Sequence, residues 1–108
     1  ALTVLRQSSI AEYIDEVYLY GSCARREQHI GSDVDLFVVL QNGFDAKQYH
    51  NALIQIMSAI QPDSFDLPQV DIKFETGHDW EKRRDLYYTN IKREGINIWG
   101  KQEIHTNI

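Results

Sequence analysis

Val34-Asp35-Leu36-Phe37-Val38-Val39-Leu40 contains the longest uninterrupted apolar run of the chain. A strand with apolar side chains on both of its faces has to be covered on both faces, as in the centre of a layered α/β sheet. Only Asp35 interrupts the run, and Asp33 comes just before it. The stretch therefore predicts a central strand that begins with two carboxylates.

Two further strands and one short extended segment are predicted around this central strand. The apolar residues 17–20 form a strand that ends at Gly21, and residues 69–74 form another after a loop bracketed by Pro62 and Pro68. Residues 96–99 form a last extended segment, because Gly95 ends the helix before it.

Helices are predicted between the strands. The residues before Val17 carry a rough helical stripe, and Ser22 caps a brief helix over 22–28. A clear helix begins at Asp45, where Gln48 completes a capping box, and a last helix covers 79–94. The expected apolar faces are Tyr49, Leu53, Ile56, Met57 and Ile60 in the first of these two helices, and Trp80, Arg84, Tyr87 and Ile91 in the second. This order predicts a small α/β sandwich, with helices packed on a sheet.

Length and composition limit the classes of protein. A chain of 108 residues allows one domain, over 1–108, with one core. The chain has no apolar run near the roughly 20 residues of a membrane helix and no visible signal peptide. Its single cysteine rules out an internal disulfide, which fits the cytoplasm. The four histidines show no ligand spacing and are expected at the surface. A net charge of −5 argues against a broad nucleic-acid surface.

Asp33 and Asp35 lie on the same side of the predicted strand, about 7 Å apart along it. Two carboxylates this close repel each other, and burying them without a partner is costly. Protonation of one, a basic neighbour or bound divalent cations would each relieve the repulsion. Adjacent carboxylate oxygens suit Mg²⁺, which binds proteins through one or two carboxylates together with substrate phosphates.

A third carboxylate, Asp71, lies in the strand predicted over 69–74. If that strand lies beside residues 34–40, Asp71 joins Asp33 and Asp35 on one face, and Lys73 points the same way. Three carboxylates around two metal ions are the arrangement that phosphoryl or nucleotidyl transfer requires. The sequence therefore predicts Asp33, Asp35 and Asp71 as metal ligands and catalytic residues.

Gly21-Ser22 supplies a candidate phosphate site. Glycine lets a phosphate approach the backbone, and the N–H groups of the helix predicted after it favour an anion. The hydroxyl of Ser22 can donate to phosphate, and Arg25 or Arg26 can reach a phosphate oxygen. The chain has no glycine-lysine-serine/threonine run, so this is not a Walker loop.

These motifs resemble those of the minimal nucleotidyltransferases of the DNA polymerase β-like superfamily. Gly21-Ser22 is followed after ten residues by Asp33-Val34-Asp35-Leu36, with Ala24-Arg25 just after the serine. Val70-Asp71-Ile72 resembles the third-carboxylate strand of that family, and residues 91–95 resemble the end of its short domains. The similarity extends over about 16–99.

The resemblance implies an α/β (α+β) fold, a small mixed sheet flanked by helices, and a chemistry. NMP, taken as AMP from ATP, would be transferred to a hydroxyl with release of pyrophosphate. Two Mg²⁺ ions would be held by Asp33 and Asp35, and Asp71 would ligate the catalytic ion and help take the acceptor proton. The residues implied for the triphosphate are Gly21, Ser22, Arg25, Ser32 and Lys73. Arg26 and Cys23 depart from the family pattern, which affects triphosphate affinity or base preference rather than catalysis.

The resemblance also implies a partner. Only nine residues follow Trp99, so we expect no helical second domain. Stand-alone forms commonly pair with a helical HEPN-type protein in toxin–antitoxin systems, where the transferase resembles an antitoxin that adenylylates a tyrosine of its partner. A protein acceptor also suits the net charge better than tRNA does. Assembly with another copy or with a different chain is left open. The alternatives are a non-catalytic module that binds nucleotide or partner and neutralises by occlusion, and a small-molecule transferase of the aminoglycoside-modifying kind.

Overall fold

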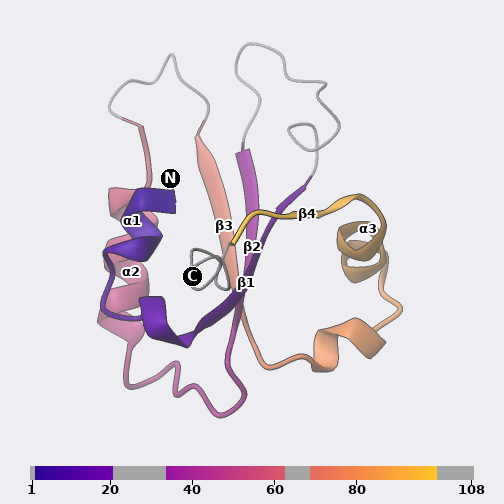
Figure 1. The fold of residues 1–108 in the computed structure, drawn as a ribbon, viewed down its shortest axis with the longest axis horizontal. Coiled ribbons are helices and arrows are strands. Elements are labelled where there is room, and N and C mark those ends of the chain that lie inside the picture. Colours follow the sequence, from indigo (N-terminus) through magenta and orange to yellow (C-terminus); the bar gives the residue numbers. More distant parts are fainter. Residues whose placement is uncertain (1, 21–33, 63–68, 100–108) are drawn as a thin grey trace, which may run out of the picture.

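A mixed sheet of four strands organises the fold (Figure 1). The computed structural model describes residues 2–20, 34–62 and 69–99. The sheet has the order β3-β2-β1-β4, and its strands are β1 (Ile14–Tyr20), β2 (Val34–Leu40), β3 (Val70–Thr76) and β4 (Ile96–Asn97). β2 is parallel to β3 and antiparallel to β1, which in turn is antiparallel to β4. The predicted fold class is confirmed.

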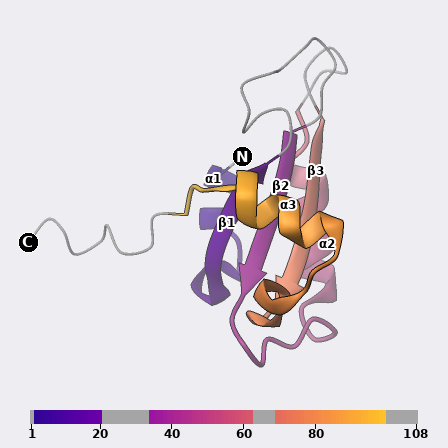
Figure 2. The same ribbon diagram turned by 90° about the vertical axis from the view of Figure 1, so that its right-hand side faces the viewer.

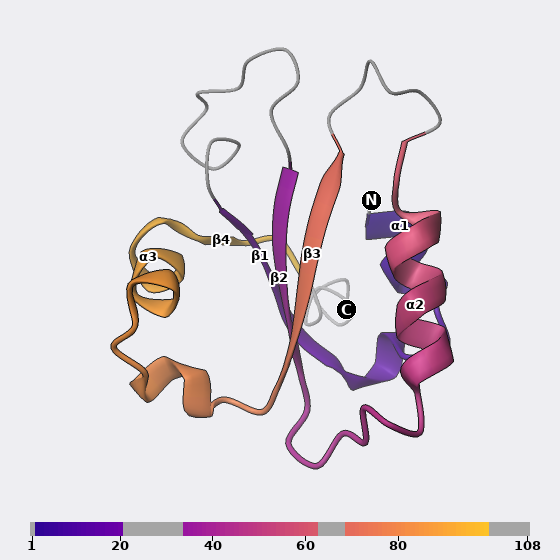
Figure 3. The same cartoon turned by 180° about the vertical axis from the view of Figure 1, so that it is seen from behind.

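Helical segments cover both faces of the sheet, as Figures 1 and 3 show from opposite sides. On one face lie α1 (Leu2–Arg6) and α2 (His50–Ala59), and the 3₁₀ turn η1 (Ala11–Tyr13) leads from α1 into β1. On the other face lie η2 (Asp79–Lys82) and α3 (Leu86–Glu94), and Figure 2 views α3 in front of the strands. Among the residues that the structure describes, no helix is both long and apolar enough to cross a membrane.

β2 is the centre of the core, as its apolar sequence predicts. Its residues 36–40 are buried, and their side chains alternate between two clusters. Leu36, Val38 and Leu40 pack on the side of α1 and α2, together with Ile56 of α2. Phe37 and Val39 pack on the other side. In this second cluster they contact Trp80 of η2 and Ile91 of α3.

The predicted helix from Asp45 begins later, at His50. The Asp45 Oδ1 atom accepts hydrogen bonds from the backbone N–H groups of Lys47 (3.1 Å) and Gln48 (3.2 Å). Asp45 therefore stabilises a turn before the helix, because a short carboxylate side chain can hydrogen-bond the backbone just after it. Met57 was expected on the apolar face, but it is 41% exposed. The buried stripe of α2 is therefore narrower than predicted.

The helix predicted over 79–94 is divided into η2 and α3 by extended backbone at Arg83 and Asp85. The Lys92 ammonium donates to the carbonyl oxygens of Glu81 (2.8 Å) and Arg83 (2.9 Å), which compensates for helical hydrogen bonds missing at the break. Arg84 is exposed there rather than on a buried face. Gly95 ends α3, as predicted.

The amino-terminal segment also differs from the continuous helical stripe that the sequence suggests. Helix α1 ends at Arg6, and β1 begins at Ile14, earlier than the predicted residue 17. Pairing with β2 explains the longer strand, since Ile14 lies opposite Leu40 at the far end of the ladder. Ile10 and Ile14 are still buried, so the apolar residues were recognised although their secondary structure was not.

Gly77 turns the chain at the end of β3. Its φ of +81° favours glycine, and a Cβ atom there would collide with Oδ1 of Asn42. The Gly77 N–H donates to the Leu40 carbonyl (2.8 Å), which fixes this turn against the end of β2. The turn places His78 next to the beginning of β1, where it contacts Asp15.

Candidate active site

Asp35 and Asp71 lie side by side on neighbouring parallel strands. The first residues of β2 and β3 and the last residues of β1 lie at the same end of the sheet (Figure 1). Asp35 is the register partner of Asp71 in β3 and of Tyr20 in β1. Adjacent strands are about 4.8 Å apart, so the two carboxylates are carried on neighbouring backbones. The prediction that the strand of Asp71 lies beside 34–40 is confirmed.

The two aspartates face the layer that contains η2 and α3. Side chains alternate along a strand, so Asp35 shares a face with Phe37, and Asp71 shares one with Lys73. Phe37 packs in the cluster with Trp80 and Ile91, which identifies this face. Asp71 is exposed and Asp35 is partly exposed, so the carboxylates lie at the accessible end of this face.

Two tyrosines and a lysine accompany the carboxylates. The hydroxyl groups of Tyr20 and Tyr87 are 3.0 Å apart, and their rings meet edge to face with centroids 5.8 Å apart. The Lys73 Nζ lies 5.2 Å from the centroid of the Tyr87 ring, within the range of a cation–π contact. Burial is the largest cause of the raised pKa of Tyr20, and the charges of Asp35 and Asp71 add to it. The part of the site that the structure describes therefore combines carboxylates with two phenols and the Lys73 cation.

Tyr87 predicts a dependence of stability on alkaline pH. Burial first, and the Tyr20 hydroxyl second, raise the pKa of Tyr87 above its ordinary value of 10.0. Above pH 10 the unfolded chain therefore releases this proton while the folded chain keeps it. The contribution of the Tyr87 proton to the free energy of unfolding is fully present below pH 10. It is lost as the pH rises through the folded-state pKa.

We expect the free energy of unfolding of Tyr87→Phe to fall less steeply above pH 10 than that of the wild type, because phenylalanine has no proton to release. Urea unfolding of both proteins at a series of pH values measures the two slopes. Equal slopes would contradict the assigned role of Tyr87.

Gln61 fixes the beginning of β3 next to Asp71. Its side-chain Nε2 donates to the Val70 carbonyl (2.7 Å), and the Val70 N–H donates to its Oε1 (2.9 Å). The same Nε2 also donates to the Met57 carbonyl in α2 (3.2 Å). β3 is an edge strand of the described sheet, so these backbone groups of Val70 have no neighbouring strand to pair with. Gln61 precedes Pro62 in a region that reads only as a loop, and no sequence signal identifies this role.

Replacing Gln61 by leucine is expected to lower the free energy of unfolding by about 1–3 kcal/mol, because the outward backbone groups of Val70 lose their partner. The Val70 amide should also exchange its proton faster. Urea unfolding and hydrogen exchange measure the two effects. Gln55→Leu, at an exposed position of α2, is the matched control and should change stability by less than about 0.5 kcal/mol. Equal effects of the two substitutions would contradict the role of Gln61.

Several residues of the predicted site lie outside the described residues. They are Gly21, Ser22, Arg25, Ser32 and Asp33, together with Cys23, Arg26 and the helix predicted over 22–28. Their roles stay predictions, as do the catalytic roles of Asp35 and Asp71 and the phosphate-binding role of Lys73. The structure does place the carboxylates of Asp35 and Asp71 on two adjacent strands. Their oxygen atoms fit the preference of Mg²⁺ for hard oxygen ligands.

The whole arrangement is that of a nucleotidyltransferase domain. Residues 6–104 match the family model described as "Polymerase beta, Nucleotidyltransferase". This match includes β1, β2 and β3 with Asp35 and Asp71. The chain belongs to this family.

Solved structures show the same fold. A toxin–antitoxin with AMP-PNP aligns with a TM-score of 0.59 and 21% identity, over 95% of this chain and 73% of the other. A mutant of the toxin–antitoxin MntA-HpeT gives 0.56 and 19%, over 95% and 72%. A putative nucleotidyltransferase from Sulfolobus solfataricus gives 0.56 and 15%, over 94% and 78%. No curated protein matches the chain.

Proposed function

We propose that this protein is a Mg²⁺-dependent nucleotidyltransferase that transfers AMP from ATP to a tyrosine hydroxyl of a HEPN-type partner protein, and thereby acts as an antitoxin in the cytoplasm. The transferase would consist of a single domain over 1–108. The observation that carries the proposal is the register of Asp35 with Asp71 in a chain of the nucleotidyltransferase family.

The proposed reaction is an in-line displacement at the α-phosphorus of ATP. The acceptor oxygen forms a new bond to this phosphorus, the bond to the bridging oxygen breaks, and its electron pair leaves with pyrophosphate. Asp71 accepts the hydroxyl proton as the new bond forms. When bound, the two Mg²⁺ ions neutralise the triphosphate and the charge that develops on it.

The other residues divide into metal ligands and phosphate ligands. Asp33 and Asp35 would hold both metal ions, and Asp71 would hold the catalytic one. The predicted phosphate-binding set is Gly21, Ser22, Arg25, Ser32 and Lys73. The Lys73 ammonium, placed over the ring of Tyr87, would remain within reach of an anion on the exposed side of the sheet.

The choice of a protein acceptor has two supports. Two of the solved structures described above are toxin–antitoxin assemblies, and one of those was solved with AMP-PNP. The net charge of −5 opposes the approach of a polyanionic acceptor such as tRNA.

The test is a transfer assay with α-labelled ATP, Mg²⁺ and the protein encoded by the neighbouring gene, which the proposal requires to be of the HEPN type. We expect label on the partner with wild type and none with Asp35→Asn. Asp79→Asn, an exposed carboxylate of η2, is the control and should label normally. If Asp35→Asn still neutralises the partner and wild type transfers no label, the protein acts by occlusion. Label on an aminoglycoside but not on the partner would indicate a small-molecule transferase.

A further inference from the structure

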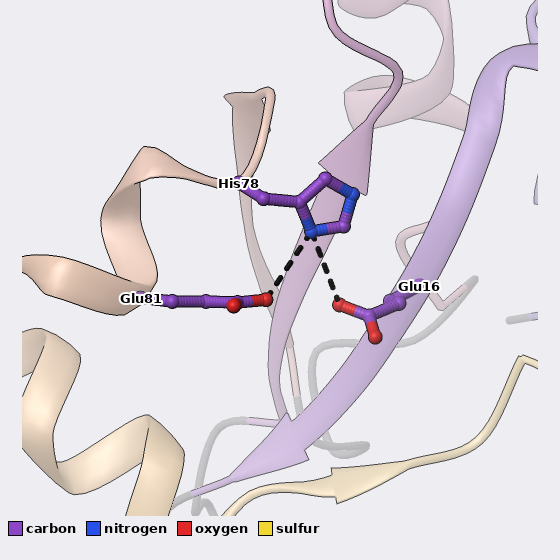
Figure 4. A group of neighbouring side chains, drawn as sticks. All are labelled: Glu16, His78 and Glu81. Atoms are coloured by element: carbon purple, nitrogen blue, oxygen red, sulfur yellow. Dashed lines mark hydrogen bonds and ion pairs between the residues drawn. The ribbon is translucent and has the colours of Figure 1, made fainter.

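A second group of metal-ligating side chains lies at the opposite end of the sheet from Asp35 and Asp71. Glu16 comes from the beginning of β1, His78 follows the end of β3, and Glu81 lies in η2 (Figure 4). The His78 Nδ1 is 3.2 Å from Glu81 Oε2 and 4.0 Å from Glu16 Oε1. One ligand atom from each residue lies within 4.8 Å of the other two. The three side chains therefore converge on one point.

Asp15 orients the imidazole of His78. Its Oδ2 is 2.9 Å from Nε2, on the opposite side of the ring from the two glutamates. A histidine that binds a metal ion through one nitrogen commonly donates its other N–H to a carboxylate, which fixes the ring and its tautomer. With Nε2–H donating to Asp15, Nδ1 faces Glu16 and Glu81 (Figure 4), and release of the Nδ1 proton would make its lone pair available to a metal ion.

Glu16 gives an independent indication of a missing ligand. Its Oε1 is buried and has no hydrogen-bond partner among the residues that the structure describes. Its separation from His78 Nδ1 exceeds hydrogen-bonding distance. The ion pair with His78 therefore compensates only part of the hydration that this oxygen loses, whereas a cation bound there would compensate more of it.

We propose that Glu16, His78 and Glu81 form a site for a divalent transition-metal ion, Zn²⁺, and that Asp15 positions His78 as its ligand. Imidazole nitrogen selects Zn²⁺ over Mg²⁺, whereas Asp35 and Asp71 offer oxygen alone. Binding places the Nδ1 lone pair on the metal, and a proton displaced from Nδ1 passes to solvent.

The geometry requires only a small adjustment. Ligands about 2.0–2.2 Å from a tetrahedral Zn²⁺ are about 3.3 Å from one another, so the carboxylates have to close by up to about 1.5 Å. The side chain of Glu81 is 50% exposed and can rotate toward the ion, whereas that of Glu16 is 26% exposed and its buried Oε1 already lies beside His78. The bound ion would join β1 to the η2 layer and leave a fourth position for water.

The test is calorimetric titration of the full chain with Zn²⁺ in excess Mg²⁺, which keeps the catalytic carboxylates occupied. We expect one Zn²⁺ per chain, and at least about tenfold weaker binding in His78→Gln, Glu81→Gln and Asp15→Asn. His50→Gln, an exposed histidine of α2, is the matched control and should bind like wild type, as should Asp35→Asn. Zn²⁺ should raise the melting temperature of wild type but not of Glu81→Gln.

Two results would overturn the site: Zn²⁺ affinity in His78→Gln and Glu81→Gln equal to that of His50→Gln, or complete displacement of Zn²⁺ by Mg²⁺. Glu81 is half exposed, so Glu81→Gln keeps the test valid if His78→Gln does not fold. Nucleotide transfer is not part of the readout, so this proposal and the proposed function fail independently.

Discussion

Asp35→Asn is expected to reduce nucleotide transfer by at least about a thousandfold while the chain remains folded. Metal ions contribute several kcal/mol to the stabilisation of a transition state, and about 4 kcal/mol corresponds to a thousandfold in rate. Asparagine keeps the shape of the side chain but removes the charge that would hold Mg²⁺. Asp35 is partly exposed near the beginning of β2, so its substitution should not disrupt the core.

The measurement is the initial rate of label transfer at saturating ATP and Mg²⁺, with far-ultraviolet circular dichroism as the check on folding. Asp71→Asn should cause a comparable loss, because Asp71 is the register partner of Asp35. The double variant should be little worse than either single one, since residues that act as a unit are not additive. A rate in Asp35→Asn within tenfold of wild type would contradict the assignment.

Phe37→Ala is expected to lower the free energy of unfolding by about 3–5 kcal/mol. The ring is 1% exposed and lies between the sheet and its helical cover. It contacts four other rings, at centroid distances of 5.0 Å to Trp80, 6.0 Å to Tyr87, 6.1 Å to Tyr88 and 6.4 Å to Tyr18. Truncation therefore leaves a cavity between the sheet and its helical cover, because the surrounding rings come from β1, η2 and α3 and cannot all move in to fill it.

Urea unfolding of wild type and variant measures this loss. Leu86→Ala also truncates an apolar side chain to alanine, but at a position that is 74% exposed, and should change stability by less than about 0.5 kcal/mol. Phe37→Leu should be intermediate, because part of the volume is retained. A loss below about 1 kcal/mol in Phe37→Ala would show that the α3 layer contributes little to folding.

The sheet and the neighbouring positions of Asp35 and Asp71 could be predicted from the sequence because they depend on local patterns. The apolar run of β2 is buried only if helices pack on both faces of the strand. The polar Asp35 before this run is then expected where the strand is still accessible to solvent. A second strand with an aspartate near its beginning then has few places to pair. The family resemblance added that the sheet is mixed and flanked by helices.

The helix boundaries and the grouping of Glu16 with His78 and Glu81 depend on tertiary contacts that no local sequence pattern encodes. Asp45 has the sequence of a helix cap, but its carboxylate stabilises a preceding turn. Lys92 reaches back to the Arg83 carbonyl and stabilises the break before α3. His78 and Glu81 lie three residues apart, but only the sheet topology brings Glu16 to them, so the sequence shows no motif for all three residues.

Gln61 also has a consequence for how the protein can associate. An exposed strand edge is a template for pairing with another chain, and an incoming strand needs the same N–H and C=O groups. The amide of Gln61 occupies those of Val70. Strand addition at the beginning of β3 would have to displace this side chain first. At Val70, next to Asp71, β-augmentation therefore competes with the Gln61 side chain, and the partner proposed above would reach the carboxylates more readily by contacts other than a shared strand.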